Sequence, residues 1–372
     1  MTLPARAQET DKLVISETLR HPHRKNRTGS GYRDNWSAEK GSDMKNTILT
    51  PPALIVMLGL LIGRTILSAE DGSTTPLRIS KHAGGFEFRD GEKPVLFYQA
   101  KPKSLDGRFE RASYVHPLYN LDGKIISEDF PVDHLHHRGI FWAWHQLYIG
   151  DIRIGDPWIC RNFLTRVDEV AIVERSGNTA AILATSHWVS PDWLDASGAQ
   201  KPMVREETQI EVWPEQENSR VIDFRIKLTA LELEVRIGGS DDVKGYGGFS
   251  PRLQLPKDIR FTAESGAVEP QKIAIDSSPW MDISGTFGEA NGNRKNSTSG
   301  VTILCHPSLP GFPQKWILRR ARSMQNPVYP GRTLVKLPTK EPLELRYRLV
   351  VHRGPASREQ LSNWFETYAA EM

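Results

Sequence analysis

Cysteine is scarce in this sequence, with two residues among 372. Several sequence motifs that are diagnostic of a function are also absent. Cys160 and Cys305 are too few for a disulfide framework, although one bridge between them remains open. The chain also lacks an internal repeat and a glycine-rich loop of the kind that cradles phosphates. The sequence therefore indicates neither a disulfide scaffold nor a nucleotide-phosphate loop.

Long apolar runs are missing apart from one near the start of the chain. Residues 51–63 read PPALIVMLGLLIG, which is the length of a signal-peptide core, and Arg64 follows them. A membrane-spanning helix needs about 20 apolar residues, so a signal peptide fits this run better than a membrane anchor does. A short positive segment before the run and small residues after it complete the layout. We predict a signal peptide over residues 44–69.

This prediction has consequences for both sides of the signal. Residues 1–43 are polar and show no sustained apolar period, so we expect them to be disordered or to precede a true start at Met44. Residues 70–372 would then form a single exported domain in the periplasm or outside the cell. We expect no contact with the membrane after the signal is cleaved.

No charge of one sign dominates the chain, whose formal net charge is +3. Residues 1–69 contain ten Lys or Arg and six Asp or Glu, so the remainder has 38 basic and 39 acidic residues. A nearly neutral chain has no electrostatic attraction to a phosphate backbone. We therefore predict that the protein has no nucleic-acid partner.

What the chain does contain, from residue 77 onward, is the period of β-strands. Apolar and polar residues alternate over residues 204–230, with a turn near 217–219, and again over residues 343–349. Ser357 followed by Gln360 forms a capping box, and apolar residues at helical spacing come after it. We predict an all-β fold, a sandwich of two large antiparallel sheets with one C-terminal helix.

Site chemistry is concentrated in residues 114–145, which hold five of the eleven histidines. The five are His116, His134, His136, His137 and His145. Carboxylates, an arginine and two tryptophans lie among them. This density is typical of a metal site or of a site for a polar ligand.

One hypothesis is a divalent metal site. In any extended conformation His134 and His136 point to one side of the chain and His137 points to the other. His134 and His136 would then be two metal ligands, and zinc or a harder ion would need a third. Candidates for the third ligand are Asp129, Asp133, His116, His145 and His306.

The other hypothesis is acid–base chemistry on a polar substrate. A histidine with the ordinary pKa of about 6.5 exchanges a proton near neutral pH, so His134, His136 and His137 are the candidate catalytic residues. Candidate substrate-binding residues are Arg138, Arg252, His116, Trp142 and Tyr246. Arginine suits carboxylates and hydroxyl groups, and tryptophan suits the apolar face of a sugar ring. In a purely structural alternative, the tryptophans pack in the core and the histidines satisfy loop backbone groups.

Five segments carry a family resemblance. They read YVHPLYNLDG at 114–123, DFPVDHLHHRG at 129–139, YGGFSPR at 246–252, TILCHP at 302–307 and LRYRLVVHRG at 345–354. Together they resemble bacterial secreted proteins labelled "methane oxygenase PmoA", over nearly all of the chain after the predicted signal. The resemblance implies a large β-sandwich similar to galactose mutarotases and sugar lyases, in a family common among polysaccharide-degrading bacteria.

The family label does not describe the chemistry of this chain. A methane-oxidising membrane subunit needs many spanning helices, and the chain has one apolar run at most, so we predict that it is not a methane monooxygenase. We predict instead a secreted carbohydrate-active enzyme, a hydrolase, lyase or epimerase, acting on a sugar or another small polar substrate. The alternative is a non-catalytic carbohydrate-binding module. No pair of carboxylates marks a glycosidase.

The histidine cluster should lie at an open face of the sandwich. Burying several imidazole and guanidinium groups without partners would cost several kcal/mol. We therefore expect His134, His136 and His137 to share one pocket with Arg138 and Arg252, outside the core.

Overall fold

The structure is a computed structural model that describes residues 76–175, 178–287 and 298–371. The chain divides into two units, Met1–Ser68 and Ala69–Met372, and all the described residues lie in the second. The predicted N-terminal extension, residues 1–43, and the predicted signal peptide, residues 44–69, lie outside the described residues.

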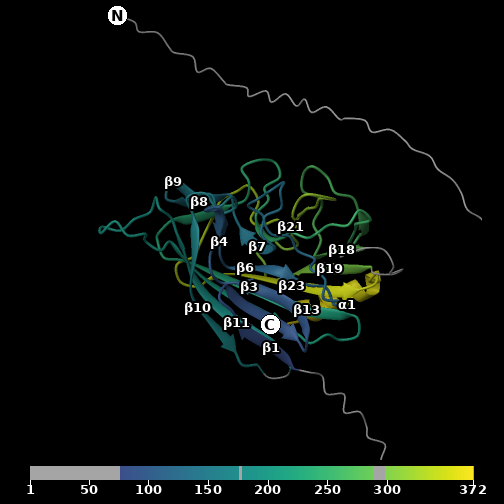
Figure 1. The fold of residues 1–372 in the computed structure, drawn as a ribbon. Helices are drawn as coiled ribbons and strands as arrows, with labels where there is room; N and C mark the ends of the chain where they lie inside the picture. The colour runs from purple at the N-terminus through teal and green to yellow at the C-terminus, as the bar shows by residue number, and fades with distance from the viewer. Residues whose placement is uncertain (1–75, 176–177, 288–297, 372) are drawn as a thin grey trace, which may run out of the picture. The chain divides into compact units, whose positions relative to one another are not determined.

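The described chain is all-β, with two large antiparallel sheets and a C-terminal helix (Figure 1). One sheet has six strands in the order β1-β2-β3-β6-β7-β15. They are β1 (Leu77–Lys81), β2 (Gly85–Asp90), β3 (Lys93–Gln99), β6 (Tyr114–Leu118), β7 (Ile140–Ala143) and β15 (Gly248–Pro251). The predicted fold class is confirmed.

The second large sheet has nine strands in the order β10-β11-β12-β13-β23-β19-β18-β16-β17. They are β10 (Leu164–Val173), β11 (Ala180–Val189), β12 (Val204–Val212), β13 (Ser219–Ala230), β23 (Leu343–Arg353), β19 (Ser299–Cys305), β18 (Trp280–Gly285), β16 (Arg260–Ala263) and β17 (Gly266–Val268). The predicted hairpin over residues 204–230 is β12 paired with β13, in which Thr208 faces Ile226.

Three smaller sheets lie at the ends of the large ones. The four-stranded sheet has the order β22-β14-β8-β9, and two further pairs are β20-β21 and β4-β5. Their strands are β22 (Val335–Lys336), β14 (Val235–Gly238), β8 (Gln146–Ile149), β9 (Ile152–Gly155), β20 (Trp316–Ile317), β21 (Asn326–Pro327), β4 (Lys103–Leu105) and β5 (Arg108–Arg111). The β4-β5 hairpin becomes part of the site described below.

The two large sheets face each other across a common apolar core. Every second residue of β13 is buried, which is the pattern of a strand with one face on a core. Phe224 of β13 packs edge-on against Trp142 of β7, with ring centroids 6.4 Å apart. Phe249 of β15 stacks on Tyr347 of β23 at 4.5 Å. These cross-sheet contacts define a sandwich; the likeness to galactose mutarotases stays a prediction.

The C-terminal helix, α1 (Arg358–Ala369), begins as the sequence predicts. The Ser357 hydroxyl accepts the backbone N–H of Gln360 at 3.1 Å, which caps the first turn. In the described ranges, no helix is long and apolar enough to cross a membrane. The two cysteines are unpaired: Cys305 is buried and Cys160 is partly exposed.

Candidate functional site

The histidines of the central stretch lie on the connection between β6 and β7, which folds as two successive turns. The His134 N–H donates to the Pro131 carbonyl at 3.0 Å, and the His137 N–H donates to the His134 carbonyl at 2.8 Å. These bonds replace the extended conformation that the metal hypothesis assumed, so His137 does not point away from the other two. The backbone turns instead bring all three imidazoles to one place.

The three imidazole rings are in mutual contact. His134 stacks on His137 with centroids 4.7 Å apart, and His136 meets His137 edge-on at 4.7 Å. His134 and His136 are 5.7 Å apart, also edge-on. The sequence prediction that these residues share a site therefore matches their placement, while their role stays a prediction.

Gly139 ends this loop where the chain crosses close to β6. Its φ of +54° is unfavourable for residues with a side chain. A Cβ atom there would lie 2.0 Å from the Val115 carbonyl oxygen, which is far shorter than a van der Waals contact. The Gly139 carbonyl accepts the Arg252 N–H at 2.7 Å. Arg252 directly follows β15, which pairs with β7, so this bond ties the loop to the end of β15.

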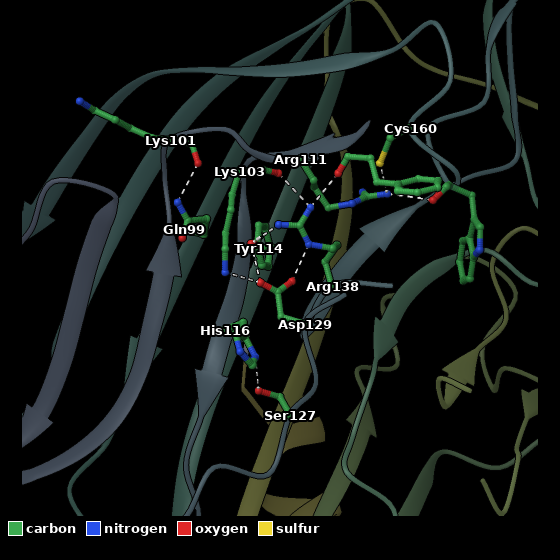
Figure 2. Close-up of polar contacts among 12 residues, drawn as sticks. Gln99, Lys101, Lys103, Arg111, Tyr114, His116, Ser127, Asp129, Arg138 and Cys160 are labelled. Carbon is green, nitrogen blue, oxygen red and sulfur yellow. Dashed lines mark hydrogen bonds and ion pairs between the residues drawn. The ribbon is translucent and has the colours of Figure 1, made fainter. Parts of the chain in front are cut away.

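Arg138 is fully buried and acts as an internal support for the loop (Figure 2). Its Nε donates to Asp129 at 2.5 Å, and one terminal nitrogen donates to the Tyr114 hydroxyl at 2.5 Å. The other terminal nitrogen donates to the carbonyls of Lys103 and Phe109, at 3.0 and 2.8 Å. Burial opposes the charge on Asp129, but Arg138 and Lys103 outweigh it and lower the pKa of that carboxyl. Arg138 has no face open to a ligand, which differs from the predicted substrate contact.

Arg252 supports the same loop from the other side. It is 1% exposed, and its Nε donates to Glu128 at 2.6 Å. A terminal nitrogen donates to both oxygens of Asp133, at 2.9 and 3.1 Å. The second terminal nitrogen lies 3.3 Å from Nδ1 of His137. Arg252 thus positions the cluster and is itself shielded from a ligand.

These partners fix the state of two histidines. A guanidinium only donates, so Nδ1 of His137 accepts from Arg252 and the ring proton is on Nε2. Burial, reinforced by the neighbouring histidines and Arg252, lowers the pKa of His137 far below its ordinary value. His134 pairs through Nδ1 with Asp133 at 2.7 Å. Burial alone would raise the pKa of Asp133, but hydrogen bonds from His134 and Arg252 lower it by more, so the pKa lies below its ordinary value. The carboxylate is therefore ionised and accepts both hydrogen bonds.

His136 is the histidine with free ring nitrogens. Among the residues that the structure describes, neither nitrogen has a hydrogen-bond partner, and the side chain is half-buried. Its ring contacts Phe109, with centroids 6.3 Å apart, as well as His137. Burial, then the positive charges of His134 and Arg111, lower its pKa to about 4. At neutral pH it therefore presents an uncharged imidazole with an available lone pair.

The cluster continues into a second group of rings. Trp158 meets His137 edge-on with ring centroids 5.7 Å apart, and His145 stacks on Trp158 at 5.2 Å. The Tyr246 ring contacts Trp158 at 4.9 Å and His145 at 5.0 Å. Nδ1 of His145 lies 3.1 Å from the Asp156 carboxylate, and its Nε2 is buried with no partner in the described chain. We call the six rings the aromatic wall: His134, His136, His137, Trp158, His145 and Tyr246.

Two predicted site residues lie elsewhere. Trp142 is 5% exposed, donates through its indole N–H to Glu206 at 3.0 Å and packs on the second sheet, so it cannot stack on a ligand. The prediction that it binds substrate is corrected here; the strand alternation of β7 turns it inward. His116 on β6 bonds the Ser127 hydroxyl at 2.9 Å, and burial lowers its pKa to about 4. It lies beside Asp129, behind the loop.

The geometry gives no support to the predicted metal site. No group of three or more His, Cys, Asp or Glu side chains in the described ranges is arranged to hold a metal ion. Of the candidate third ligands, Asp129 and Asp133 bind arginines. His306 bonds Ser308 and the Glu371 carbonyl near the C-terminus, away from the cluster.

Sequence reasoning missed Arg111, Asp156 and Phe109. Arg111 ends β5, is 5% exposed, and donates to the carbonyls of Pro157 and Trp158 at 2.8 and 3.0 Å. Its Nε is buried without a partner. These residues carry no motif, and the folding of the β4-β5 hairpin onto the loop after β9 brings them to the wall. No sequence signal marks that contact.

The comparisons with known proteins identify a family and no activity. The profile of a family of unknown function, DUF6807, matches residues 86–366. That range contains all of the aromatic wall and both arginines that support the loop. No curated protein matches the chain.

Proposed function

Because the chain belongs to the DUF6807 family, whose function is unknown, we propose its activity from its site: an exported carbohydrate-active enzyme that moves a proton on a sugar. His136 is the observation that supports this most. Its imidazole is uncharged at neutral pH, free of hydrogen-bond partners in the described chain and partly open to solvent. Neither ring nitrogen is among the buried atoms without a partner, so both are within reach of solvent or of a ligand.

The neighbours of His136 favour proton transfer over hydrolysis by two carboxylates. The nearby carboxylates Glu128 and Asp133 both bind Arg252, and neither is free to act as an acid or a nucleophile. Epimerisation and elimination both begin with removal of a proton, which a neutral imidazole can accept. His145, oriented by Asp156, is a second imidazole in the same wall. We therefore favour an epimerase or a lyase.

Two apolar rings, Tyr246 in the wall and Phe109 beside His136, suit a sugar. Phe109 and Tyr246 are half-buried, so each offers part of a ring face to a ligand. Sugars present apolar C–H faces as well as hydroxyl groups, and the imidazoles between these rings supply polar contacts. Trp158 is nearly fully buried, and its part is to hold the histidines in place.

Turnover of sugars by wild-type protein and by His136→Gln tests the proposal. A library of oligosaccharides and polysaccharides would be screened for new reducing ends, unsaturated products and changed stereochemistry. Loss of an acid–base residue should lower kcat by about 100- to 10,000-fold. His82→Gln is the matched control, because His82 is an exposed residue in the turn between β1 and β2 and does not belong to the wall.

Two results would reject the enzyme. Wild-type protein that binds a sugar without ever converting it would instead be a carbohydrate-binding module. Turnover unchanged in a folded His136→Gln protein would show that the reacting group lies elsewhere.

A further inference from the structure

A hollow of about 540 Å³ opens beside the aromatic wall, between the β4-β5 hairpin and the segment after β9. This volume lies within the range of about 300–1,000 Å³ that is usual for small-molecule sites. The lining residues used below are Arg108, Phe109, Glu110, Cys160, Arg161 and Gln200. Their mixture of charged, amide and aromatic groups suits a polar ligand.

The hollow borders the aromatic wall through Phe109, although no ring of the wall lines the hollow itself. Phe109 lines the hollow and its ring contacts His136 at 6.3 Å. Cys160 also lines it, and its sulfur accepts a hydrogen bond from Arg111 at 3.2 Å (Figure 2). Phe109 therefore separates a ligand in the hollow from His136, the histidine of the cluster whose ring nitrogens have no partner in the described chain.

The charges around the hollow are mainly positive. Arg108 and Arg161 line it, and Glu110 is the one carboxylate in the lining. Arg161 is 65% exposed and reaches its nearest carboxylate, Asp156, only at 3.9 Å. Arg108 has no carboxylate within 4 Å in the described chain. Two guanidinium groups are thus available to an anion.

A third cation lies behind these two. Arg111 is 95% buried, has no carboxylate partner among the described residues, and its Nε is buried without a hydrogen bond. A buried guanidinium that lacks a counter-charge is costly, and an anion nearby would offset that cost. This charge adds to the field that the exposed arginines create in the hollow.

We propose that the hollow binds the carboxylate of an acidic sugar, so that the substrate is a uronate rather than a neutral sugar. The inference rests on the proposed function and names its substrate class. A guanidinium grips a carboxylate through two parallel hydrogen bonds, while the sugar ring lies against Phe109. Phe109 also contacts His136, so the proposal requires the C–H bond next to the carboxylate to reach that histidine past the edge of the Phe109 ring.

This substrate also fits the chemistry of the wall. His136 takes the proton from the carbon next to the carboxylate, and the electron pair of that bond passes into the carboxylate as an enolate. In epimerisation a solvent water gives a proton to the carbon on the other face, and the imidazolium of His136 returns its proton to the solvent. In elimination the electron pair forms a double bond as the bond to the neighbouring oxygen substituent breaks, and that oxygen takes the proton from the His136 imidazolium. Burial and positive neighbours lower the pKa of His136 in the free protein, and the negative charge of the ligand would raise it and so make the imidazole a better base.

Binding of matched sugars tests the proposal. The probes are galacturonate against galactose and glucuronate against glucose, which differ only in the carboxylate, measured by calorimetry. We expect each acid to bind at least about tenfold more tightly than its neutral partner, with the preference falling as salt rises. The double variant R108Q/R161Q should lose the preference, and Arg78→Gln, an exposed arginine on β1, should keep it. Equal binding of acid and neutral sugar, or a preference that survives R108Q/R161Q, would overturn the proposal.

The two cysteines locate the bound sugar. Cys160 lines the hollow and is partly exposed, whereas Cys305 is fully buried and serves as an internal control. Galacturonate should slow alkylation of Cys160 by iodoacetamide, as followed by mass spectrometry, and galactose should not. If neither galacturonate nor glucuronate slows the alkylation of Cys160, the carboxylate binds elsewhere and the inference is rejected. If the acid protects Cys160 while His136→Gln keeps full turnover, the substrate class stands and the proposed catalytic role fails.

Discussion

The three clustered histidines are chemically different because different groups hold them. Asp133 accepts from His134, and Arg252 donates to His137, so each of these rings has one nitrogen committed to a neighbour. His136 has neither kind of partner in the described chain. We infer that His134 and His137 shape the surface against which His136 works.

Arg138 tests whether the loop depends on its internal ion pair. Replacing it in Arg138→Gln leaves the Asp129 carboxylate, 5% exposed, without its main counter-charge. Breaking a buried pair in this way costs about 3–5 kcal/mol. Urea denaturation should show that loss, whereas Arg78→Gln, which breaks an exposed pair with Glu92, should change stability by less than about 1 kcal/mol. Similar losses for the two variants would contradict the supporting role of Arg138.

At the scale of the element, backbone turns decide what the sequence could not show. Strand alternation predicted β12, β13 and β23 because period two is visible in the residues themselves. The same reasoning failed for His134 to His137, since turn hydrogen bonds replace the extended chain there. Arg252 reaches the loop from more than 100 residues away, and only the pairing of β7 with β15 brings it there.

Gly139 tests the crossing of the loop over β6. In Gly139→Ala the new Cβ would meet the Val115 carbonyl oxygen at 2.0 Å, and the positive φ adds about 1–2 kcal/mol of strain. Gly150 has a nearly equal φ of +55° with nothing within 4 Å, so Gly150→Ala should cost the strain alone. Chemical denaturation should rank Gly139→Ala clearly below Gly150→Ala in stability. Equal losses would mean that the loop can move away from β6.

At the scale of the whole molecule, the two large sheets support the connections that carry the site, above all the one between β6 and β7. The two large sheets could be predicted from the sequence because apolar residues recur with the period of a strand. The histidine cluster could be predicted because five histidines fall within residues 114–145. No sequence pattern indicated the Arg111, Asp156 and Phe109 contacts, because these depend on how separate hairpins pack. The local sequence around each of these residues would look the same whether or not the hairpins packed together.

Acid should weaken the folded state through the buried histidines. Burial lowers the pKa of His116 and of His136 to about 4, from an ordinary value of 6.5. Between about pH 6.5 and pH 4 the unfolded chain therefore binds protons that the folded chain does not, so stability falls as pH falls. Each such histidine contributes up to about 1.4 kcal/mol per pH unit. The free energy of unfolding, measured in urea at several pH values, should fall less steeply for His136→Gln than for wild-type protein; equal slopes would show that His136 is not buried as described.

The most direct test of the central claim, that His136 is the neutral base of an acid–base site, is the pH dependence of kcat/KM on a uronate substrate. Because the lowered pKa of His136 is about 4, its base form is lost only as pH falls through that value. We predict a plateau from about pH 5 to pH 8, with a fall of one proton's slope centred near pH 4 and folding checked by circular dichroism at each point. A fall centred near the ordinary histidine value of 6.5, or the same profile in His136→Gln, would contradict the account.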